Sequence, residues 1–306
     1  MKTRRVSNFG LWVRDAPQDV PDEPSFIGGT DPRQLKVHRE QPKRDVPYLP
    51  TDAPVVAAML RFAEVGPGDT LYDLGCGDGR IVLAAARRGA RAVGVDIDLQ
   101  RIQECRENLA NASRDVRDRT RFIRGSFFDL DVSDATVVAT YLLPSVNVKL
   151  RPKLLFELRP GARIISNYFD IGDWQPDVSQ SVHHRVLHKW IVPAWVEGAW
   201  RCVVNTPGER RHLTLRLRRK YQTVWGTAQI GRTEVQLVNP MLWGDRLSFT
   251  LLARPPYWRA TRYEAVVSPD GGHLRGTCHT VGEADGTYAW GGHRVARPVV
   301  ERTGVN

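Results

Sequence analysis

Residues 71–80 read Leu-Tyr-Asp-Leu-Gly-Cys-Gly-Asp-Gly-Arg, and the alanine-rich run Ile81–Ala86 follows them. The apolar start predicts a short strand ending near Asp73, and the alanine-rich run predicts a helix. Glycine is required where the backbone takes left-handed dihedrals or approaches a ligand closely. Three alternate glycines between a strand and a helix therefore predict a bare loop at a helix N-terminus, which suits a cofactor. A tight turn with nothing bound is the alternative.

A second acid stands where such a fold needs one. Residues 91–96, Arg-Ala-Val-Gly-Val-Asp, predict the next strand, which ends in Asp96. In Rossmann-type sheets an acid about 20 residues after the glycine loop accepts hydrogen bonds from ribose hydroxyls. Asp98 is expected to be the N-cap of a helix over residues 99–110.

The same alternation of strand and helix continues to about residue 168. The expected strands are 70–74, 91–96, 120–123, 135–141 and 162–168, and the expected helices are 79–88, 99–111 and 147–158. This order predicts an α/β domain with a Rossmann-like, doubly wound, mostly parallel sheet. Ligands in such sheets bind beyond the carboxyl ends of the strands. Residues 183–193 are expected to form a late strand of the same sheet.

The remainder of the chain shows a different pattern. His212–Arg218 alternates apolar and polar residues, which predicts a strand with one buried face. Further strands are expected at 221–229, 234–238, 247–252, 262–267, 274–279 and 288–295. They predict a C-terminal all-β antiparallel barrel or sandwich domain. The expected division is an N-terminal arm (1–44), the α/β domain (45–195), the β-domain (196–297) and a tail (298–306).

The chain is basic, with a formal net charge of +10 over 306 residues. Six positive side chains concentrate in one segment of the β-domain: Arg210, Arg211, Arg216, Arg218, Arg219 and Lys220. They are compatible with a binding module for an acidic protein, nucleic acid or anionic surface, and equally with a solvated polar face. Four tryptophans of this domain, Trp225, Trp243, Trp258 and Trp290, are expected to be core or girdle residues rather than a base-stacking platform.

Cysteine and histidine usage favours neither disulfides nor a metal. The four cysteines are far apart and form no C-x-x-C motif, which favours a reduced, cytoplasmic setting. His184 and His188 are four residues apart, a metal-ligand spacing for a helix but not for the expected strand, so no metal site is predicted. No apolar run approaches the roughly 20 residues of a membrane span.

Five motifs together resemble one known family. They are the stretches 46–51 (Val-Pro-Tyr-Leu-Pro-Thr), 73–80, 141–147 (beginning Tyr-Leu-Leu-Pro and ending in Asn147), 150–155 and 172–177. The glycine loop with its preceding acid resembles the first motif of class I S-adenosylmethionine (SAM) methyltransferases. The whole set, over residues 45–195, is similar to the protein-lysine methyltransferases of ATP-synthase subunit c and of the adenine nucleotide translocase, with their bacterial relatives.

The resemblance implies SAM as the cofactor and assigns candidate site residues. The candidate cofactor-binding residues are Tyr48, Thr51, Asp73, Gly75, Cys76, Gly77, Gly79, Asp96, Ser126 and Phe127. Ser126 stands where many relatives carry an acid for the adenine amino group, so its hydroxyl, a backbone group or packing on Phe127 would hold adenine. Tyr48 and Thr51 either cover the cofactor or only cap and pack the next helix.

Two further residues are candidates for the acceptor side. Tyr141 is expected to line the methyl-acceptor pocket and Asn147 to orient the amine or the loop, unless they only shape a strand-to-helix turn. The activity implied is methyl transfer to a nucleophilic nitrogen, with a protein lysine and hence a protein partner favoured. The alternatives are RNA or a small molecule as acceptor, and a non-catalytic SAM-binding protein whose β-domain binds a partner.

Overall fold

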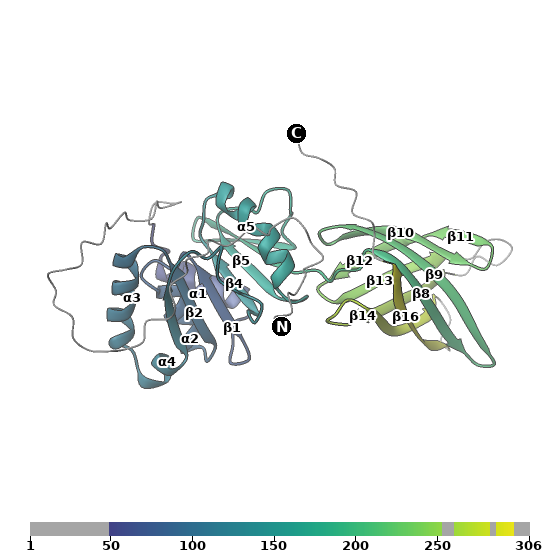
Figure 1. The fold of residues 1–306 in the computed structure, drawn as a ribbon, viewed down its shortest axis with the longest axis horizontal. Coiled ribbons are helices and arrows are strands. Elements are labelled where there is room, and N and C mark those ends of the chain that lie inside the picture. The colour runs from purple at the N-terminus through teal and green to yellow at the C-terminus, as the bar shows by residue number, and fades with distance from the viewer. Residues whose placement is uncertain (1–48, 253–259, 282–285, 297–306) are drawn as a thin grey trace, which may run out of the picture. The chain divides into compact units, whose positions relative to one another are not determined.

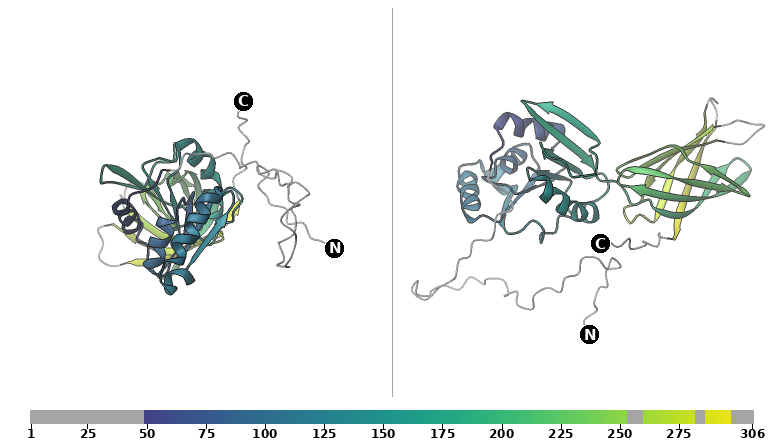
Figure 2. Two further views of the ribbon diagram at one scale, coloured as in Figure 1. Left: turned by 90° about the vertical axis from the view of Figure 1, so that its left-hand side faces the viewer. Right: turned by 90° about the horizontal axis from the view of Figure 1, so that it is seen from above.

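Two β-sheets organise the residues that the computed structural model describes, 49–252, 260–281 and 286–296 (Figures 1 and 2). Both sheets belong to one compact unit of the chain, Gln41–Asn306. The expectations for the N-terminal arm, the tail, Tyr48 and Trp258 lie outside the described residues.

The first sheet has seven strands in the order β3-β2-β1-β4-β5-β7-β6. Its strands are β1 (Thr70–Leu74), β2 (Arg91–Asp96), β3 (Thr120–Arg124), β4 (Val137–Thr140), β5 (Arg163–Asn167), β6 (Val178–Val182) and β7 (Arg185–Ile191). The first five are parallel, whereas β7 runs antiparallel to β5 and to β6. Because β1 lies between β2 and β4, the strand order reverses at β1, where ligands bind in sheets of this kind. The predicted α/β fold is confirmed.

Helices cover both faces of this sheet (Figure 1). They are α1 (Ala53–Phe62), α2 (Arg80–Arg87), α3 (Leu99–Ala110), α4 (Arg114–Asp118) and α5 (Pro144–Glu157). Successive residues of a strand point to opposite faces. Val137 accordingly joins the cluster built with α1, α2 and α3, while Val138 joins the one built with α5. None of the described helices is both long enough and apolar enough to cross a membrane.

Several predicted boundaries in this half were wrong. The helix expected from Asn147 begins at Pro144, because proline suits the first turn of a helix, where no amide donor is needed. The strand expected from His183 begins at Arg185, since His183 and His184 form a turn with positive φ. Strand β6 and helix α4 had not been predicted.

The second sheet is antiparallel and has nine strands in the order β11-β10-β9-β8-β16-β15-β14-β13-β12. Its strands are β8 (Gly198–Thr206), β9 (Glu209–Lys220), β10 (Thr223–Ile230), β11 (Thr233–Gln236), β12 (Val238–Trp243), β13 (Arg246–Leu252), β14 (Ala260–Val267), β15 (His273–Thr280) and β16 (Thr287–Ala296). The all-β prediction is confirmed, although β8 and β12 had not been predicted.

This sheet curls around a single core, nearly as a barrel (Figure 2). Leu213, Leu215 and Leu217 of β9 point into that core with Trp200 and Phe249. Strands β10 and β12, which are not neighbours in the hydrogen-bonded order, contact each other across the open side.

The tryptophans of this sheet divide into two classes. Trp290 is buried and packs edge-on against Phe249 and Tyr263, as expected of a core residue. Trp225 and Trp243 are each 46% exposed, because both occupy outward positions of their strands. Of the two predicted roles, core or girdle, the core role is therefore excluded for Trp225 and Trp243.

We predict that Gly94→Ala destabilises the protein. A Cβ at position 94 would lie 2.7 Å from Phe122 Cδ1 and 2.9 Å from Cys76 Sγ, so the ring and the thiol would have to move. Overpacking of this kind costs about 1–3 kcal/mol, measurable as a lower midpoint of urea unfolding. Gly125→Ala is the control, because a Cβ there meets nothing within 4 Å. Equal midpoints for the two variants would contradict the steric account.

Candidate active site

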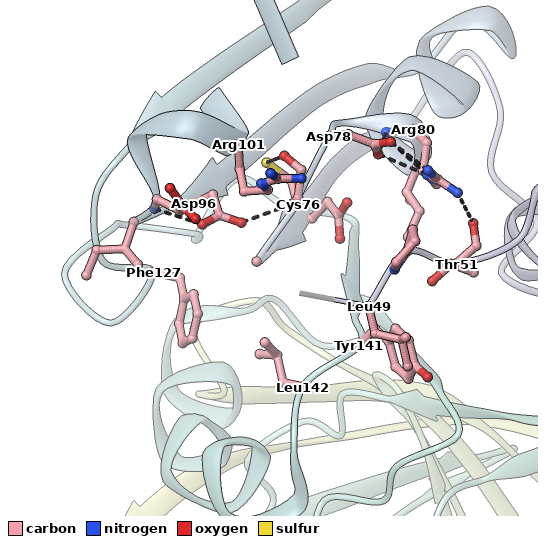
Figure 3. Close-up of a pocket in the computed structure, with 17 residues that line it drawn as sticks. Leu49, Thr51, Cys76, Asp78, Arg80, Asp96, Arg101, Phe127, Tyr141 and Leu142 are labelled. Atoms are coloured by element: carbon pink, nitrogen blue, oxygen red, sulfur yellow. Dashed lines mark hydrogen bonds and ion pairs between the residues drawn. The ribbon is translucent and has the colours of Figure 1, made fainter. Parts of the chain in front are cut away.

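A pocket opens at the carboxyl ends of β1, β2 and β4, where the strand order reverses (Figure 3). The residues that line it come from the segment before α1, the glycine loop, the first turns of α2 and α3, the end of β2 and the loops after β3 and β4. They are Leu49, Pro50, Thr51, Asp73, Gly75, Cys76, Gly77, Asp78, Arg80, Ile81, Asp96, Ile97, Asp98, Arg101, Phe127, Tyr141 and Leu142.

The glycine loop follows a left-handed course that other residues rarely adopt. The φ angles of Gly75, Gly77 and Gly79 are 82°, 54° and 80°. At Gly75 a side chain would also be crowded, since a Cβ would lie 3.0 Å from Leu142 Cδ2. The loop therefore presents bare backbone to the pocket in front of α2.

Asp96 holds the loop in place from the next strand. Its Oδ2 accepts a hydrogen bond from the Gly77 amide at 3.0 Å, and its Oδ1 accepts one from the Asp98 amide at 2.9 Å. Burial raises the pKa of this carboxyl, and the two amide bonds oppose the shift. Each carboxylate oxygen accepts more than one hydrogen bond, so capacity remains for a hydroxyl in the pocket.

Asp73 is the most strongly perturbed acid of the pocket. Its side chain is buried, and its Oδ2 has no hydrogen-bond partner among the described residues. Burial raises the pKa of Asp73 to about 8, and the nearby charges of Asp96 and Asp78 add to the shift. A buried carboxylate without a partner is costly, so this oxygen suits a cationic ligand group such as an ammonium.

Other unpaired polar atoms lie at the same edge of the sheet. Among the described residues, four buried side-chain N or O atoms have no partner, and three of them belong to Asp73, Thr140 and Asn167. Asp73 lies near the end of β1, and Thr140 and Asn167 are the last residues of β4 and β5. Buried polar groups are normally hydrogen-bonded, so this edge is where a polar ligand would be accommodated.

Arg80 ties the segment before α1 to the glycine loop. Its guanidinium donates to both carboxylate oxygens of Asp78 and, through Nη1, to the Thr51 carbonyl at 2.8 Å. The Thr51 hydroxyl accepts a hydrogen bond from Asn167 Nδ2. Thr51 was expected either to cover the cofactor or to cap the next helix; Asp52 occupies the N-cap position of that helix, α1, and Thr51 lines the pocket.

An aromatic and apolar side faces the loop. Figure 3 shows Phe127, Leu142 and Tyr141 opposite the glycine loop and Asp96. The Tyr141 ring stacks on Phe169, with centroids 5.8 Å apart. The Arg185 guanidinium lies 5.8 Å from the Tyr141 centroid and 5.8 Å from that of Tyr168.

Most of the predicted site residues meet in this pocket, and three do not. Ser126 is absent from the lining, since its hydroxyl accepts a hydrogen bond from the Phe128 amide within the turn. Gly79 faces Phe122 rather than the pocket. Asn147 is buried behind it and donates to the carbonyls of Leu142 and Asp170, so it supports the Tyr141–Leu142 loop without reaching the pocket.

The sequence reasoning missed the groups that hold the loop from a distance. Arg80 and Asp78 belong to the glycine-loop motif, but no role was predicted for either residue. Cys105 Sγ donates to the Gly77 carbonyl at 3.0 Å, and Asn108 Nδ2 donates to the Asp78 carbonyl at 3.0 Å. Cys105 and Asn108 both lie on α3. Only their three-residue spacing, which places them on one face of the helix, could have indicated that both bind the glycine loop.

Comparison with known proteins decides the family. The ANTKMT methyltransferase domain matches residues 73–178. A protein-lysine N-methyltransferase of Saccharolobus islandicus is 48% identical over 134 residues, which cover 43% of this chain and 81% of that protein. The chain belongs to this methyltransferase family. Its cofactor is accordingly SAM, and the unpaired carboxylate oxygen of Asp73 and the bare glycine loop fit the cofactor's amino-acid end.

Two other relatives of this methyltransferase are informative about coverage. The adenine nucleotide translocase lysine N-methyltransferase of Mus musculus is 37% identical, and the match covers 43% of this chain but only 56% of that protein. The solved structure of an RNA methyltransferase from Salinibacter ruber, in complex with S-adenosyl-L-homocysteine, is 47% identical. The match covers 47% of the present chain and 94% of the Salinibacter chain, with a TM-score of 0.46.

We predict that Asp73→Asn stabilises the ligand-free methyltransferase at pH 8 while weakening SAM binding. The folded protein keeps the Asp73 proton to about pH 8, whereas an unperturbed aspartate releases it near 3.8. The stability of the wild type therefore falls as the pH rises between these values, and a neutral asparagine removes that loss. Loss of the ion pair with the SAM ammonium should weaken binding roughly tenfold or more.

Thermal unfolding at several pH values and calorimetry with SAM measure the two effects. Asp129→Asn, at an exposed turn position, is the control and should change neither quantity. Wild-type affinity of the Asp73→Asn variant for SAM would contradict the assignment.

Proposed function

We propose that this methyltransferase transfers the methyl group of SAM to a lysine side chain of a protein. The observation that carries the proposal is the aromatic end of the pocket, where Tyr141 adjoins Leu142 and stacks on Phe169. None of these three side chains carries a carboxylate or an imidazole, so they suit an alkyl-amine acceptor that arrives as the neutral amine. The printed name of the archaeal relative, a protein-lysine N-methyltransferase, supports the same acceptor.

The cofactor is held in this proposal by the groups of the loop and the strand ends. Asp73 pairs with the ammonium of the amino-acid end, next to the bare backbone of the glycine loop. Asp96 accepts hydrogen bonds from the ribose hydroxyls with the lone pairs that Gly77 and Asp98 leave available. Phe127 packs against the adenine, and the Leu49–Thr51 segment covers the site.

Bound SAM supplies an electrophilic methyl group on a sulfonium. The lysine nitrogen attacks with its lone pair, so that an N–C bond forms as the C–S bond breaks and the sulfur departs neutral. The lysine ammonium gives up one proton to water before the attack, and the product nitrogen carries the positive charge that the sulfur loses. The protein contributes alignment, and such positioning is worth about 7–11 kcal/mol in well-oriented systems.

Arg185 is the charged group of the described structure that lies over this aromatic end. Its guanidinium covers the Tyr141 and Tyr168 rings. A like charge disfavours the ammonium form of an approaching lysine, and the apolar wall disfavours it further by desolvation. Both effects favour the neutral nucleophile without a dedicated general base.

We predict that labelled methyl groups from SAM enter protein when the enzyme is incubated with cell lysate. The label should be sensitive to protease, resistant to nuclease, and recovered as methyl-lysine after acid hydrolysis. Asp73→Asn at limiting SAM is the control for enzyme-dependent transfer. Label that is sensitive to nuclease would identify RNA as the acceptor and contradict the proposal. Label found only in a small molecule other than SAM would also contradict it.

Tyr141→Ala should lower kcat/KM for the protein acceptor by roughly tenfold to a hundredfold, because the acceptor loses one wall of its channel. Tyr141→Phe keeps the ring and should retain more of the activity. Transfer at the wild-type rate by both variants would remove Tyr141 from the acceptor site. Calorimetry with SAM separates a cofactor effect from an acceptor effect.

A further inference from the structure

The positive charge of the chain lies outside the α/β part. Residues 45–195 hold 19 Lys or Arg and 19 Asp or Glu, whereas residues 196–306 hold 16 and 9. Net charge at the level of a domain governs association with charged partners rather than the fold. The second sheet is therefore the described structure in which to search for an anionic partner.

Arginines lie on the outward face of β8 and β9, and β10 is the next strand beside β9 in the sheet (Figure 1). On β9, Leu215 and Leu217 point into the core, so Arg216 and Arg218 point outward, about 7 Å apart along the strand. On β8, Arg201 is exposed and pairs in register with Thr214, two residues before Arg216. These residues define what we call the basic face: Arg201, Arg216 and Arg218, with Trp225 of β10.

Trp225 lies within this basic face. It is directly opposite Arg218 in the β9–β10 register and is 46% exposed. A large aromatic ring that stays exposed beside guanidinium groups gains little from folding. The same ring offers a flat surface for stacking.

Acidic side chains do not neutralise this face. Arg216 has one distant partner, Glu234 at 3.7 Å, and its side chain remains 68% exposed. Within the described ranges, no carboxylate lies within 4.0 Å of Arg201 or Arg218. Lys220, at the end of the same strand, pairs with Asp173 and is excluded from the basic face.

We propose that the basic face binds single-stranded nucleic acid. Guanidinium groups recognise phosphates, and an exposed tryptophan stacks on an unpaired base, so the two residue types together match the backbone and base of one strand. An acidic peptide would use the arginines but would leave the ring without a stacking partner. The proposal places the working surface of the β-domain, residues 196–297, on β8–β10, and it does not depend on the nature of the methyl acceptor.

The same sheet offers a matched control. Trp243 of β12 and Arg246 of β13 are also an exposed, directly opposite tryptophan–arginine pair. There, however, Asp245 precedes the arginine, and Arg216 and Arg218 are on other strands. Trp243→Ala and Arg246→Ala thus remove the same chemistry outside the basic face.

Fluorescence anisotropy of a labelled oligouridine RNA of about 12 nucleotides, with the full-length protein, tests the proposal. Trp225→Ala should weaken binding at least about fivefold, since stacking on one aromatic is worth about 1–3 kcal/mol. Arg216→Ala combined with Arg218→Ala should weaken it tenfold or more. The logarithm of the binding constant should fall linearly with the logarithm of the salt concentration, with a slope of about −0.7 for each phosphate contact to a single strand. Three contacts therefore give a slope of about −2 in the wild type, and the double variant, which keeps one contact, should approach −0.7.

A DNA probe, the two control variants and a polyanion competitor complete the experiment. Oligothymidine DNA in place of RNA should also bind, because a stacking and phosphate surface does not require the 2′-hydroxyl. Each of three results would overturn the proposal: losses of the same size in the Trp243→Ala and Arg246→Ala controls, equal competition by polyglutamate, or no binding at roughly 50 mM salt. An unchanged urea-unfolding midpoint and near-UV circular dichroism of every variant verify that the second sheet is intact.

Discussion

The hydrogen bond from the Gly77 amide to Asp96 is the contact on which the site depends. It joins the turn after β1 to the end of β2 and holds the loop in a left-handed course that would be unstable alone. The amides of Gly75 and Cys76 reinforce it by donating to the Val95 carbonyl. Because the loop is fixed by backbone bonds from the neighbouring strand, its geometry exists before a ligand arrives.

The same edge of the sheet carries an energetic cost. Asp73 is buried with an unpaired oxygen, and folding must retain a proton there that water would remove. A stable scaffold would avoid this arrangement, whereas a binding site exploits it, because the ligand relieves the cost and is bound more tightly as a result. The fully buried strands β1 and β4 make the cost tolerable, since they fix the position of the carboxylate with apolar packing on both faces.

The features that could be predicted from the sequence are those written in local patterns. Asp73, the glycines and Asp96 follow one another along the chain, and Leu213, Leu215 and Leu217 mark β9 by simple alternation. The rest depends on contacts between distant residues. Arg80 reaches the Thr51 carbonyl 29 positions away, and no local pattern indicates this bond.

Two residues show the same limit. Ser126 was a candidate for the adenine because of its position in a family pattern, with a backbone group or packing on Phe127 as alternatives, and its hydroxyl accepts a hydrogen bond from the Phe128 amide within the turn. Trp225 was expected to be a core or girdle residue, and the pairing of β10 with β9 turns it outward, which excludes the core. In each case residue type was a weaker guide than the register or the turn that positions the residue.

Phe122 has a consequence for how relatives of this chain can vary. Its ring lies where a Cβ on Gly79 or Gly94 would be, at 2.5 Å and 2.7 Å respectively. Gly79 thus belongs to the cofactor motif in the sequence, but in the structure it is the ring of Phe122 on β3 that occupies the space of a side chain at this position. A smaller side chain at position 122 would remove only part of this restriction, because Cys76 Sγ lies 2.9 Å from a Cβ on Gly94 and because Gly79 has a φ of 80°. Invariance of the third glycine among relatives would then record the shape of the core as much as the shape of the ligand.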